Sequence, residues 1–372
     1  MINFLKEIFY LINFFSIFKN KKKIVFYSEG NNNWIHLRNL IKNIEKKTTF
    51  PIIYITSSKS DYGLKFSNKK VIKLLITSRS LVNWTISNLD KSIVCMSTPD
   101  LNKYGFNKSK KNSKYYYIHH SLCSLHMIYR ESAFNAFDVM LCSGNHHLRE
   151  IRKIVKFYDL PKKEIIKYGY PRISEIKKNL TIKLKNKFLN TKKTILLAPS
   201  WGKNTILNYY NTKLIELFIK DFNIILRPHP RTIMMDTELI KKIKDKYCGN
   251  HSFIYDESPN CEKSFYNSDM LISDWSGVAY EYSLTTNKFV LFIDLPKKIN
   301  NPNYKKIKIK PFEEIMRNKI GKILKRSNLN KIKNTINASI DDKFDISDYI
   351  YKQSQGNKAV IKKINIDLKS LN

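Results

Sequence analysis

Cysteine is scarce in this sequence, and its spacing is not that of a metal site. The chain has five cysteines, an odd number, and no two of them are separated by two residues. This pattern argues against a Cys-based zinc site and against a framework of structural disulfides, and it is typical of a reducing compartment. Cys95 and Cys142 lie in apolar runs, so we expect them to be buried thiols.

Acidic residues are also few. The sequence has 31 Asp and Glu against 67 Lys and Arg, which gives a net charge of +36. It contains no Asp-x-Asp, the motif by which many nucleotide-sugar enzymes hold a metal ion, and we predict neither a metal site nor a cofactor. The abundance of Lys, Asn and Ile is typical of AT-rich coding sequences, which explains part of the charge. The rest creates a positive field that favours anionic partners. Nucleic acid is not predicted as a partner, because none of the usual nucleic-acid-binding motifs occurs.

The start of the chain lacks an apolar run long enough to cross a bilayer. Residues 2–18 are aromatic-rich and interrupted by polar residues, and a basic segment follows them instead of preceding them, unlike in a signal peptide. We therefore predict an amphipathic membrane-interface helix at residues 1–22, with the lysines reaching lipid phosphates. This predicts a peripheral protein on the cytoplasmic face of the plasma (inner) membrane. The alternative is a helix packed on the protein body.

Short apolar runs alternate with helical or loop segments along most of the chain. This alternation predicts an α/β fold with two Rossmann-like domains facing a cleft, at residues 23–165 and 166–345. A C-terminal helix is expected at 346–372, and another helix at 312–324. The expected strands are 24–27, 52–55, 71–75, 93–96, 115–118 and 139–142, then 195–198, 224–226, 253–255, 270–272 and 289–292.

A polar turn follows the apolar run at residues 270–272. The turn contains the small or polar residues Ser273, Asp274, Ser276 and Gly277, and a helical pattern starts at Val278. Strand, polar turn and helix start together present free backbone N–H groups, which suit a phosphate or diphosphate. An ordinary capped helix explains this turn equally well.

A second motif, Arg-Pro-His-Pro-Arg, occupies residues 227–231 at the end of an expected strand. The two prolines hold His229 stiffly, and Arg227 and Arg231 flank it. This arrangement suits a phosphate oxyanion, although a solvated loop histidine has a similar prior probability.

The densest group of titratable residues is His119, His120 and His126, directly after the expected strand 115–118. Ligands of parallel sheets bind beyond the carboxyl ends of the strands, so these histidines are predicted to face the cleft. A metal site is a weaker interpretation, because no carboxylate lies nearby at ligand spacing.

Taken together, these motifs resemble the CDP-glycerol glycerophosphotransferase family, the teichoic-acid and capsule polymerases. Arg-Pro-His-Pro at 227–230 and Ser-Asp-Trp-Ser-Gly at 273–277 are similar to two family segments. The Gly-Tyr-Pro-Arg that ends at Arg172 and the Ala-Pro-Ser-Trp that ends at Trp201 are similar to two more. The resemblance implies a GT-B fold, in which the helix expected at 346–372 could cross back to the first domain.

The resemblance also implies the roles of individual residues. His120 corresponds to the family's proposed catalytic base, with His119 as the alternative, although the family's His-Gly-Thr-Pro is absent here. His229 is expected to be a second catalytic residue. The expected donor-binding residues are Arg227, Ser273, Asp274, Ser276, Gly277, Glu281, His119, His126 and Arg172.

The implied reaction moves glycerol phosphate, or a similar polyol phosphate, from a CDP-alcohol to a hydroxyl. The expected partners are CDP-glycerol or a related nucleotide donor, a lipid-linked or polymeric acceptor and an anionic membrane surface. The alternatives are a GT-B glycosyltransferase that uses a nucleotide sugar for surface polysaccharide synthesis, and a basic binding protein without enzymatic activity.

Overall fold

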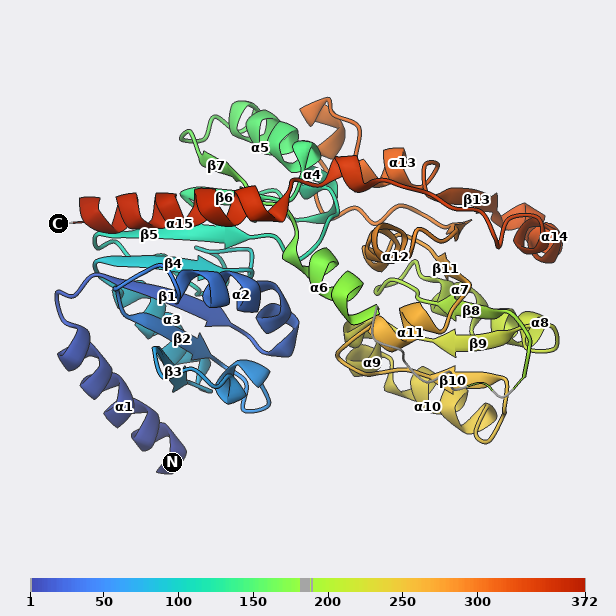
Figure 1. Ribbon diagram of the computed structural model, residues 1–372, viewed down its shortest axis with the longest axis horizontal. Helices are drawn as coiled ribbons and strands as arrows, with labels where there is room; N and C mark the ends of the chain where they lie inside the picture. Colours follow the sequence, from blue (N-terminus) through green and yellow to red (C-terminus); the bar gives the residue numbers. More distant parts are fainter. Residues whose placement is uncertain (1, 181–187, 189, 372) are drawn as a thin grey trace.

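The protein contains two parallel β-sheets placed side by side (Figure 1). The computed structural model describes residues 2–180, 188 and 190–371. The N-terminal sheet has the strand order β3-β2-β1-β4-β5-β6-β7, and the C-terminal sheet has the order β10-β9-β8-β11-β12-β13. The expected α/β class is therefore confirmed.

The strands agree closely with the expected runs. In the N-terminal sheet they are β1 (Lys23–Ser28), β2 (Ile52–Thr56), β3 (Val71–Leu75), β4 (Ser92–Met96), β5 (Ser113–Ile118), β6 (Val139–Cys142) and β7 (Glu164–Lys167). In the C-terminal sheet they are β8 (Thr194–Leu197), β9 (Asn223–Leu226), β10 (Phe253–Tyr255), β11 (Met270–Ser273), β12 (Val290–Asp294) and β13 (Gly321–Lys325).

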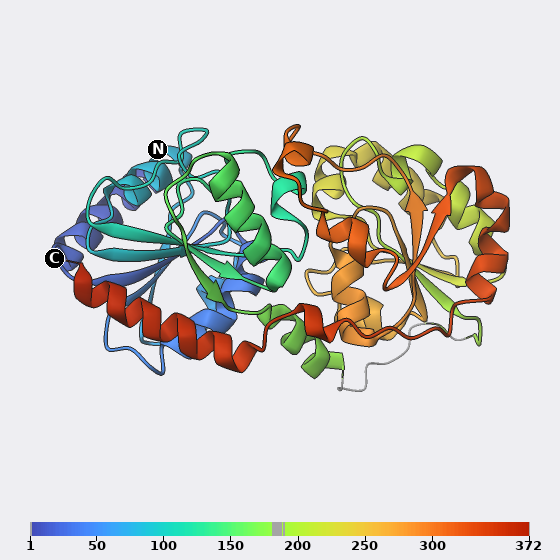
Figure 2. The same ribbon diagram turned by 90° about the horizontal axis from the view of Figure 1, so that it is seen from above.

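Helices cover both faces of each sheet (Figure 2). In the N-terminal half they are α1 (Ile2–Phe18), α2 (Asn31–Ile44), α3 (Arg79–Asn88), α4 (Leu125–Ile128), α5 (Asn145–Phe157) and α6 (Pro171–Leu180). In the C-terminal half they are α7 (Ile206–Tyr210), α8 (Lys213–Phe218), α9 (Pro230–Met235), α10 (Thr237–Lys246), α11 (Glu262–Tyr266), α12 (Val278–Thr286), α13 (Phe312–Met316), α14 (Ile332–Asn337) and α15 (Gln353–Ser370).

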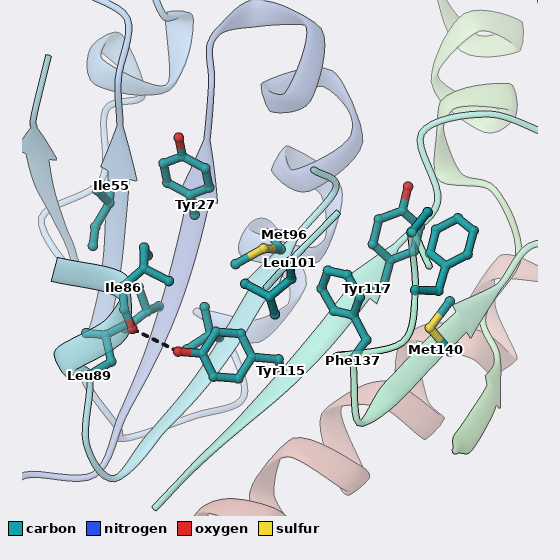
Figure 3. Packing of buried hydrophobic residues seen from close by; sticks show 14 of the residues in the cluster. Tyr27, Ile55, Ile86, Leu89, Met96, Leu101, Tyr115, Tyr117, Phe137 and Met140 are labelled. Atoms are coloured by element: carbon teal, nitrogen blue, oxygen red, sulfur yellow. Dashed lines mark hydrogen bonds between the residues drawn. The ribbon is translucent and has the colours of Figure 1, made fainter. Parts of the chain in front are cut away.

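Burial on both faces explains why the central strands are apolar throughout. Side chains alternate along a strand, so Val25 and Tyr27 of β1 pack in one core layer (Figure 3), whereas Ile24 and Phe26 pack in the layer behind the sheet. Within the first layer, the Tyr115 hydroxyl donates a hydrogen bond to the carbonyl of Ile86, 2.9 Å away. The polar atom of Tyr115 is therefore satisfied although the side chain is fully buried.

Two edge strands were not expected from the sequence. The helix expected at 312–324 is wrong: α13 ends at Met316, and β13 occupies Gly321–Lys325. Lysines at both ends of β13 interrupt its apolar pattern, as is common in edge strands.

The expected domain boundary at 165/166 falls inside β7, the other unexpected edge strand. Because β7 pairs with β6, we propose to place the boundary after Lys167.

The last helix, α15, lies against the N-terminal sheet, although the segment before it comes from the C-terminal half (Figure 1). Asp367 of α15 accepts hydrogen bonds from Lys114 Nζ at 2.8 Å and from the Tyr116 hydroxyl, both on β5. The chain therefore ties its two halves together at its C-terminal end.

Helix α1 packs on α3 through one face. Leu11, Phe14 and Phe18 are buried in the core of the N-terminal half, and Phe15 contacts Trp84 of α3 at a ring distance of 5.0 Å. Glu7 accepts a hydrogen bond from the backbone N–H of Thr77 at 2.9 Å. Among the described residues, no helix is both long and apolar enough to cross a membrane.

Candidate active site

The candidate site lies where three segments from the two halves meet. They are the loop of residues 119–126 after β5, the turn of residues 273–277 after β11, and the loop of residues 295–303 after β12, which we call the His loop, the Ser-Asp turn and the Lys loop. All three follow the carboxyl ends of parallel strands, where ligands of such sheets bind.

Gly277 shows how closely the first two segments approach each other. A Cβ atom at Gly277 would lie 2.9 Å from Ser121 Oγ and 3.1 Å from Cys123 Sγ. The φ angle of Gly277 is −62°, which any residue can adopt, so space and not backbone conformation favours glycine here. The start of α12 therefore rests directly on the His loop.

His120 is the histidine of the His loop that is placed to act as a base. Its Nδ1 lies 2.9 Å from the carbonyl oxygen of Ser97 and 3.0 Å from the Tyr117 hydroxyl, and its Nε2 lies 3.2 Å from the Tyr129 hydroxyl. A carbonyl only accepts, so Nδ1 carries the proton, and the unprotonated Nε2 accepts a hydrogen bond from the Tyr129 hydroxyl. Burial lowers the pKa of His120, although the Ser97 hydrogen bond opposes this, so the ring is neutral at pH 7.

The other two histidines of the loop point elsewhere. His119 is only 3% exposed and packs on Tyr117 and His147, with ring distances of 5.0 and 4.1 Å. His126 is buried beside Glu150, with Nδ1 3.5 Å from the carboxylate, and its Nε2 lies 3.1 Å from the carbonyl of Ile309. Both positions are those of packed residues, which leaves His120 as the base that the geometry favours.

His229 has the opposite tautomer. Its Nδ1 accepts a hydrogen bond from the backbone N–H of Arg231 at 3.1 Å, so the proton must be on Nε2. Burial, followed by repulsion from Lys298 and Arg231, lowers the pKa of His229 to about 3. His229 is thus a neutral hydrogen-bond donor, and His120 contributes to the same lowering of its pKa.

The side chains of the Ser-Asp turn hold the turn itself. Ser273 donates to the carbonyl of Ala198 at 2.7 Å. Asp274 accepts from the backbone N–H groups of Ser200 at 2.8 Å and Ile206 at 3.0 Å, and also from that of Trp275. These contacts show that Asp274 fixes the turn, and its expected donor contact stays a prediction. The anion-binding groups left here are the backbone N–H groups of Ser276 and Gly277, for which no hydrogen bond is found within the described residues.

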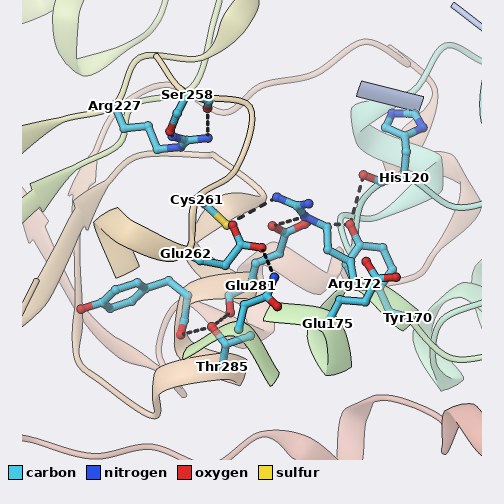
Figure 4. Close-up of polar contacts among 12 residues, drawn as sticks. His120, Tyr170, Arg172, Glu175, Arg227, Ser258, Cys261, Glu262, Glu281 and Thr285 are labelled. Atoms are coloured by element: carbon cyan, nitrogen blue, oxygen red, sulfur yellow. Dashed lines mark hydrogen bonds and ion pairs between the residues drawn. The ribbon is translucent and has the colours of Figure 1, made fainter. Parts of the chain in front are cut away.

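Arg172 and Glu281 bind each other (Figure 4). Arg172 Nε lies 2.9 Å from Glu281 Oε2, and the Tyr170 hydroxyl donates to Glu281 Oε1 at 2.7 Å and to the carbonyl of His120 at 3.2 Å. Arg172 is 7% exposed and also contacts Cys261 Sγ at 3.4 Å. This buried network links His120 to α12, and a donor contact of Arg172 or Glu281 stays a prediction.

Arg227 is also paired within the protein. Its Nη1 lies 2.6 Å from Asp256 Oδ2, and its Nη2 donates to the carbonyl of Ser258 at 2.8 Å (Figure 4). The expected phosphate contact of Arg227 would require it to leave these partners.

Two residues that lie at the site were not predicted from the sequence. They are Lys298, on the Lys loop, and Tyr129, whose hydroxyl lies beside Nε2 of His120. One lysine among so many carries no signal, and Tyr129 lies outside every motif. His36 was missed as well, although it is buried with its ring 6.2 Å from that of His120. Within the described ranges, no three His, Cys, Asp or Glu side chains converge in a metal-binding group.

Comparisons with known proteins agree on this fold. A variant of the wall teichoic acid polymerase TagF is 15% identical, with a TM-score of 0.58 over 99% of both chains. TagF soaked with CDPG is 17% identical, with a TM-score of 0.58 over 94% of this chain and 89% of that chain. MnaA of S. aureus with UDP is 13% identical, with a TM-score of 0.58 over 94% and 97%. At these identities the likeness shows the fold alone, and it confirms the expected GT-B-like architecture.

A search of curated proteins found no match. The sequence model of the CDP-Glycerol:Poly(glycerophosphate) glycerophosphotransferase family matches residues 8–295, which include the His loop, His229 and the Ser-Asp turn. Because this match covers most of the chain and all of these segments, the protein belongs to that family.

Proposed function

We propose that this protein transfers glycerol phosphate, or a similar polyol phosphate, from a CDP-alcohol to a hydroxyl of a surface-polymer or lipid-linked acceptor. The acceptor oxygen forms a bond to the phosphorus that carries the polyol, and the P–O–P bond breaks. CMP leaves as a phosphate anion. The observation that carries the proposal is the pair of histidines with opposite tautomers, His120 and His229, which are electrostatic neighbours.

His120 supplies the base. Its unprotonated Nε2 takes the proton of the acceptor hydroxyl as the oxygen attacks, while the Ser97 carbonyl stabilises the positive ring that forms. A positioned histidine base typically contributes about 10²–10⁴-fold to the rate. CMP needs little protonation to leave, so removal of the acceptor proton is the step that most needs a catalytic group.

His229 and the start of α12 hold the diphosphate. The Nε2–H of His229 donates to a phosphate oxygen, and the N–H groups of Ser276 and Gly277 point their dipoles at a second oxygen. These donors are fixed before the substrate arrives, because Arg231 N–H and the Asp274 contacts orient them. The match to the CDP-Glycerol:Poly(glycerophosphate) glycerophosphotransferase family supports a CDP-alcohol as the donor.

Substitution of each histidine tests the proposal. H120A should lower kcat by about 10²–10⁴-fold, and H229A by about 10²–10³-fold. H251A is the matched control, since His251 is exposed and outside the site, and it should keep full activity. Thermal melting of all variants checks folding. Full turnover in H120A would refute its role as the base.

A glycosyltransferase that uses a nucleotide sugar is the second candidate. The specific observation in its favour is that the His loop lacks the family's His-Gly-Thr-Pro sequence. Purified protein should therefore be offered CDP-glycerol, CDP-ribitol and a panel of nucleotide sugars in parallel. Turnover of a nucleotide sugar alone would favour this second candidate.

We also propose that α1 binds the cytoplasmic face of the membrane. Its outer face exposes Phe9, Tyr10 and Ile12 by 60–63%, although its inner face is packed on the protein. Basic residues follow it at Lys19, Lys21 and Lys22, whereas Lys23 is buried. Exposed apolar side chains beside lysines suit an anionic lipid surface. One face of the helix is thus packed on the protein, and the opposite face is available to lipid.

Vesicle sedimentation tests this second proposal. The double variant F9S/I12S should bind phosphatidylglycerol-containing vesicles at least tenfold more weakly than the unmodified protein, because it removes two exposed apolar side chains. The core of the protein should be unaffected, since neither side chain is buried. Unchanged binding to the vesicles would contradict the proposal.

A further inference from the structure

Two cationic side chains lie over the ring of Trp201, beside His229. Lys298 Nζ is 3.7 Å from the centroid of the Trp201 ring, and the guanidinium carbon of Arg231 is 4.0 Å from a ring centroid of the same residue. The rings of Trp201 and His229 are 6.0 Å apart. The segments after β9 and β12 thus bring two positive charges to an aromatic ring that the segment after β8 supplies.

Among the described residues, neither cation forms an ion pair with a carboxylate, although Glu29 is an electrostatic neighbour of Arg231 and Asp274 one of Lys298. Across residues 2–180, 188 and 190–371, no ion pair involves Lys298 or Arg231. The neighbouring cations differ: Lys297 pairs with Glu314 at 2.5 Å, and Arg227 pairs with Asp256 at 2.6 Å. Two unpaired like charges held near one aromatic ring repel each other, so an anion bound between them would be stabilised.

The Lys loop is fixed in a position that faces the site. The Trp275 indole N–H donates to the carbonyl of Leu295 at 2.8 Å, and Asn300 donates to the carbonyls of Met127 at 2.9 Å and Ile128 at 2.6 Å. The loop is therefore tied at one end to the Ser-Asp turn and at the other to α4, which begins within the His loop. Lys298 lies between these ties.

The electrostatic neighbours of Lys298 place it next to both segments. Burial lowers the pKa of Lys298 to about 8, while Cys123 of the His loop and Asp274 of the Ser-Asp turn act in the opposite direction. Lys298 also contributes to the lowered pKa of His229. The positive charge of Lys298 therefore interacts with the His loop, the Ser-Asp turn and His229. The side chain remains mostly protonated at neutral pH.

We propose that Lys298, together with Arg231, binds an oxyanion of the substrate diphosphate and determines how tightly the donor is held. Trp201 keeps the two cations in position by cation–π contacts while the site is empty. The inference rests on the proposed function for the identity of the diphosphate, but the binding of a diphosphate can be measured without turnover.

Isothermal titration calorimetry with CDP, inorganic pyrophosphate and cytidine tests the inference. K298Q should bind CDP and pyrophosphate about ten- to hundred-fold more weakly, which is the usual effect of losing one charge-assisted hydrogen bond. Its affinity for cytidine should not change. K297Q is the matched control, because Lys297 is the adjacent residue, carries the same charge and is paired with Glu314.

A second readout separates binding from a structural role. Pyrophosphate should change the intrinsic fluorescence of the protein as Lys298 and Arg231 shift on Trp201, and W201F should abolish that change. Equal pyrophosphate affinity in K298Q and K297Q would overturn the inference. Loss of pyrophosphate affinity in K298Q would support it even if no CDP-alcohol is turned over, and that combination would refute the proposed function alone.

Discussion

At the scale of single residues, the chemistry depends on which nitrogen of each histidine carries the proton. A backbone carbonyl fixes the proton of His120 on Nδ1, and a backbone N–H fixes that of His229 on Nε2. The fold thus makes one imidazole an acceptor and the other a donor, although both have the same intrinsic chemistry. Backbone groups set these roles, so side-chain substitutions nearby should not exchange them.

The pH dependence of kcat/KM follows from these residues. Burial lowers the pKa of His120, so activity should be constant down to about pH 6.5 and fall only below it, as the base becomes protonated. The pKa of Lys298 is about 8, so activity should also fall above that pH as its positive charge is lost. K298Q should lack the alkaline decline. Activity that rises as the pH falls below 6 would show that His120 does not act as a base.

At the scale of secondary-structure elements, α15 shows how tightly the chain end is bound to the N-terminal sheet. A Cβ atom at Gly356 would lie 1.9 Å from the carbonyl oxygen of Tyr168, which is a backbone atom and cannot move aside cheaply. Glycine is therefore required by close approach, although it weakens a helix.

G356A tests this packing. Alanine gains about 1 kcal/mol in helix propensity, but overpacking typically costs about 1–3 kcal/mol or more, so the free energy of unfolding should decrease. Urea denaturation measures the difference. Q355A, at the exposed neighbouring position, should be neutral or slightly stabilising. A G356A protein more stable than the original would show that α15 does not pack as described.

At the scale of the whole molecule, the two halves are joined through buried polar contacts as well as apolar ones. Glu313 of α13 accepts a hydrogen bond from the backbone N–H of Ser124 in the His loop at 2.8 Å. The ring of Phe312 stacks on His146 at 4.0 Å. The position of the His loop therefore depends on an element of the opposite half.

The stability of this junction should depend on pH. Burial raises the pKa of Glu313 from 4.5 to about 7, and the nearby Glu150 also raises it, whereas the Ser124 hydrogen bond lowers it. The folded protein therefore binds this proton more tightly than the unfolded chain does. The resulting stability is present below about pH 4.5 and is lost as the pH rises through about 7.

E313Q should keep the protonated geometry at every pH. Its melting temperature should exceed that of the original protein at pH 8, and the difference should shrink toward pH 5. E314Q, the adjacent residue on the same helix, is the control. An equal gain at both pH values would mean that Glu313 does not titrate in the folded state.

Much of the fold could be predicted from the sequence, because buried parallel strands are continuous apolar runs with polar ends. The exceptions have physical reasons: lysines interrupt β13 at the sheet edge, and β7 has only two apolar residues, which lie between charged ones. His120 and His229 were predicted as site residues because polar groups at strand ends converge. The pairing of Arg227 with Asp256, and of Arg172 with Glu281, depends on distant segments and leaves no local pattern.

The nucleotide product tests the central claim most directly. The protein, CDP-glycerol and a membrane-derived acceptor should be incubated together, and the released nucleotide should be identified by chromatography. Attack at phosphorus predicts CMP, formed in equal amount with glycerol phosphate added to the acceptor and lost in H120A. Release of CDP would mean that the bond to the transferred group breaks on the other side of the phosphate, and it would contradict the account.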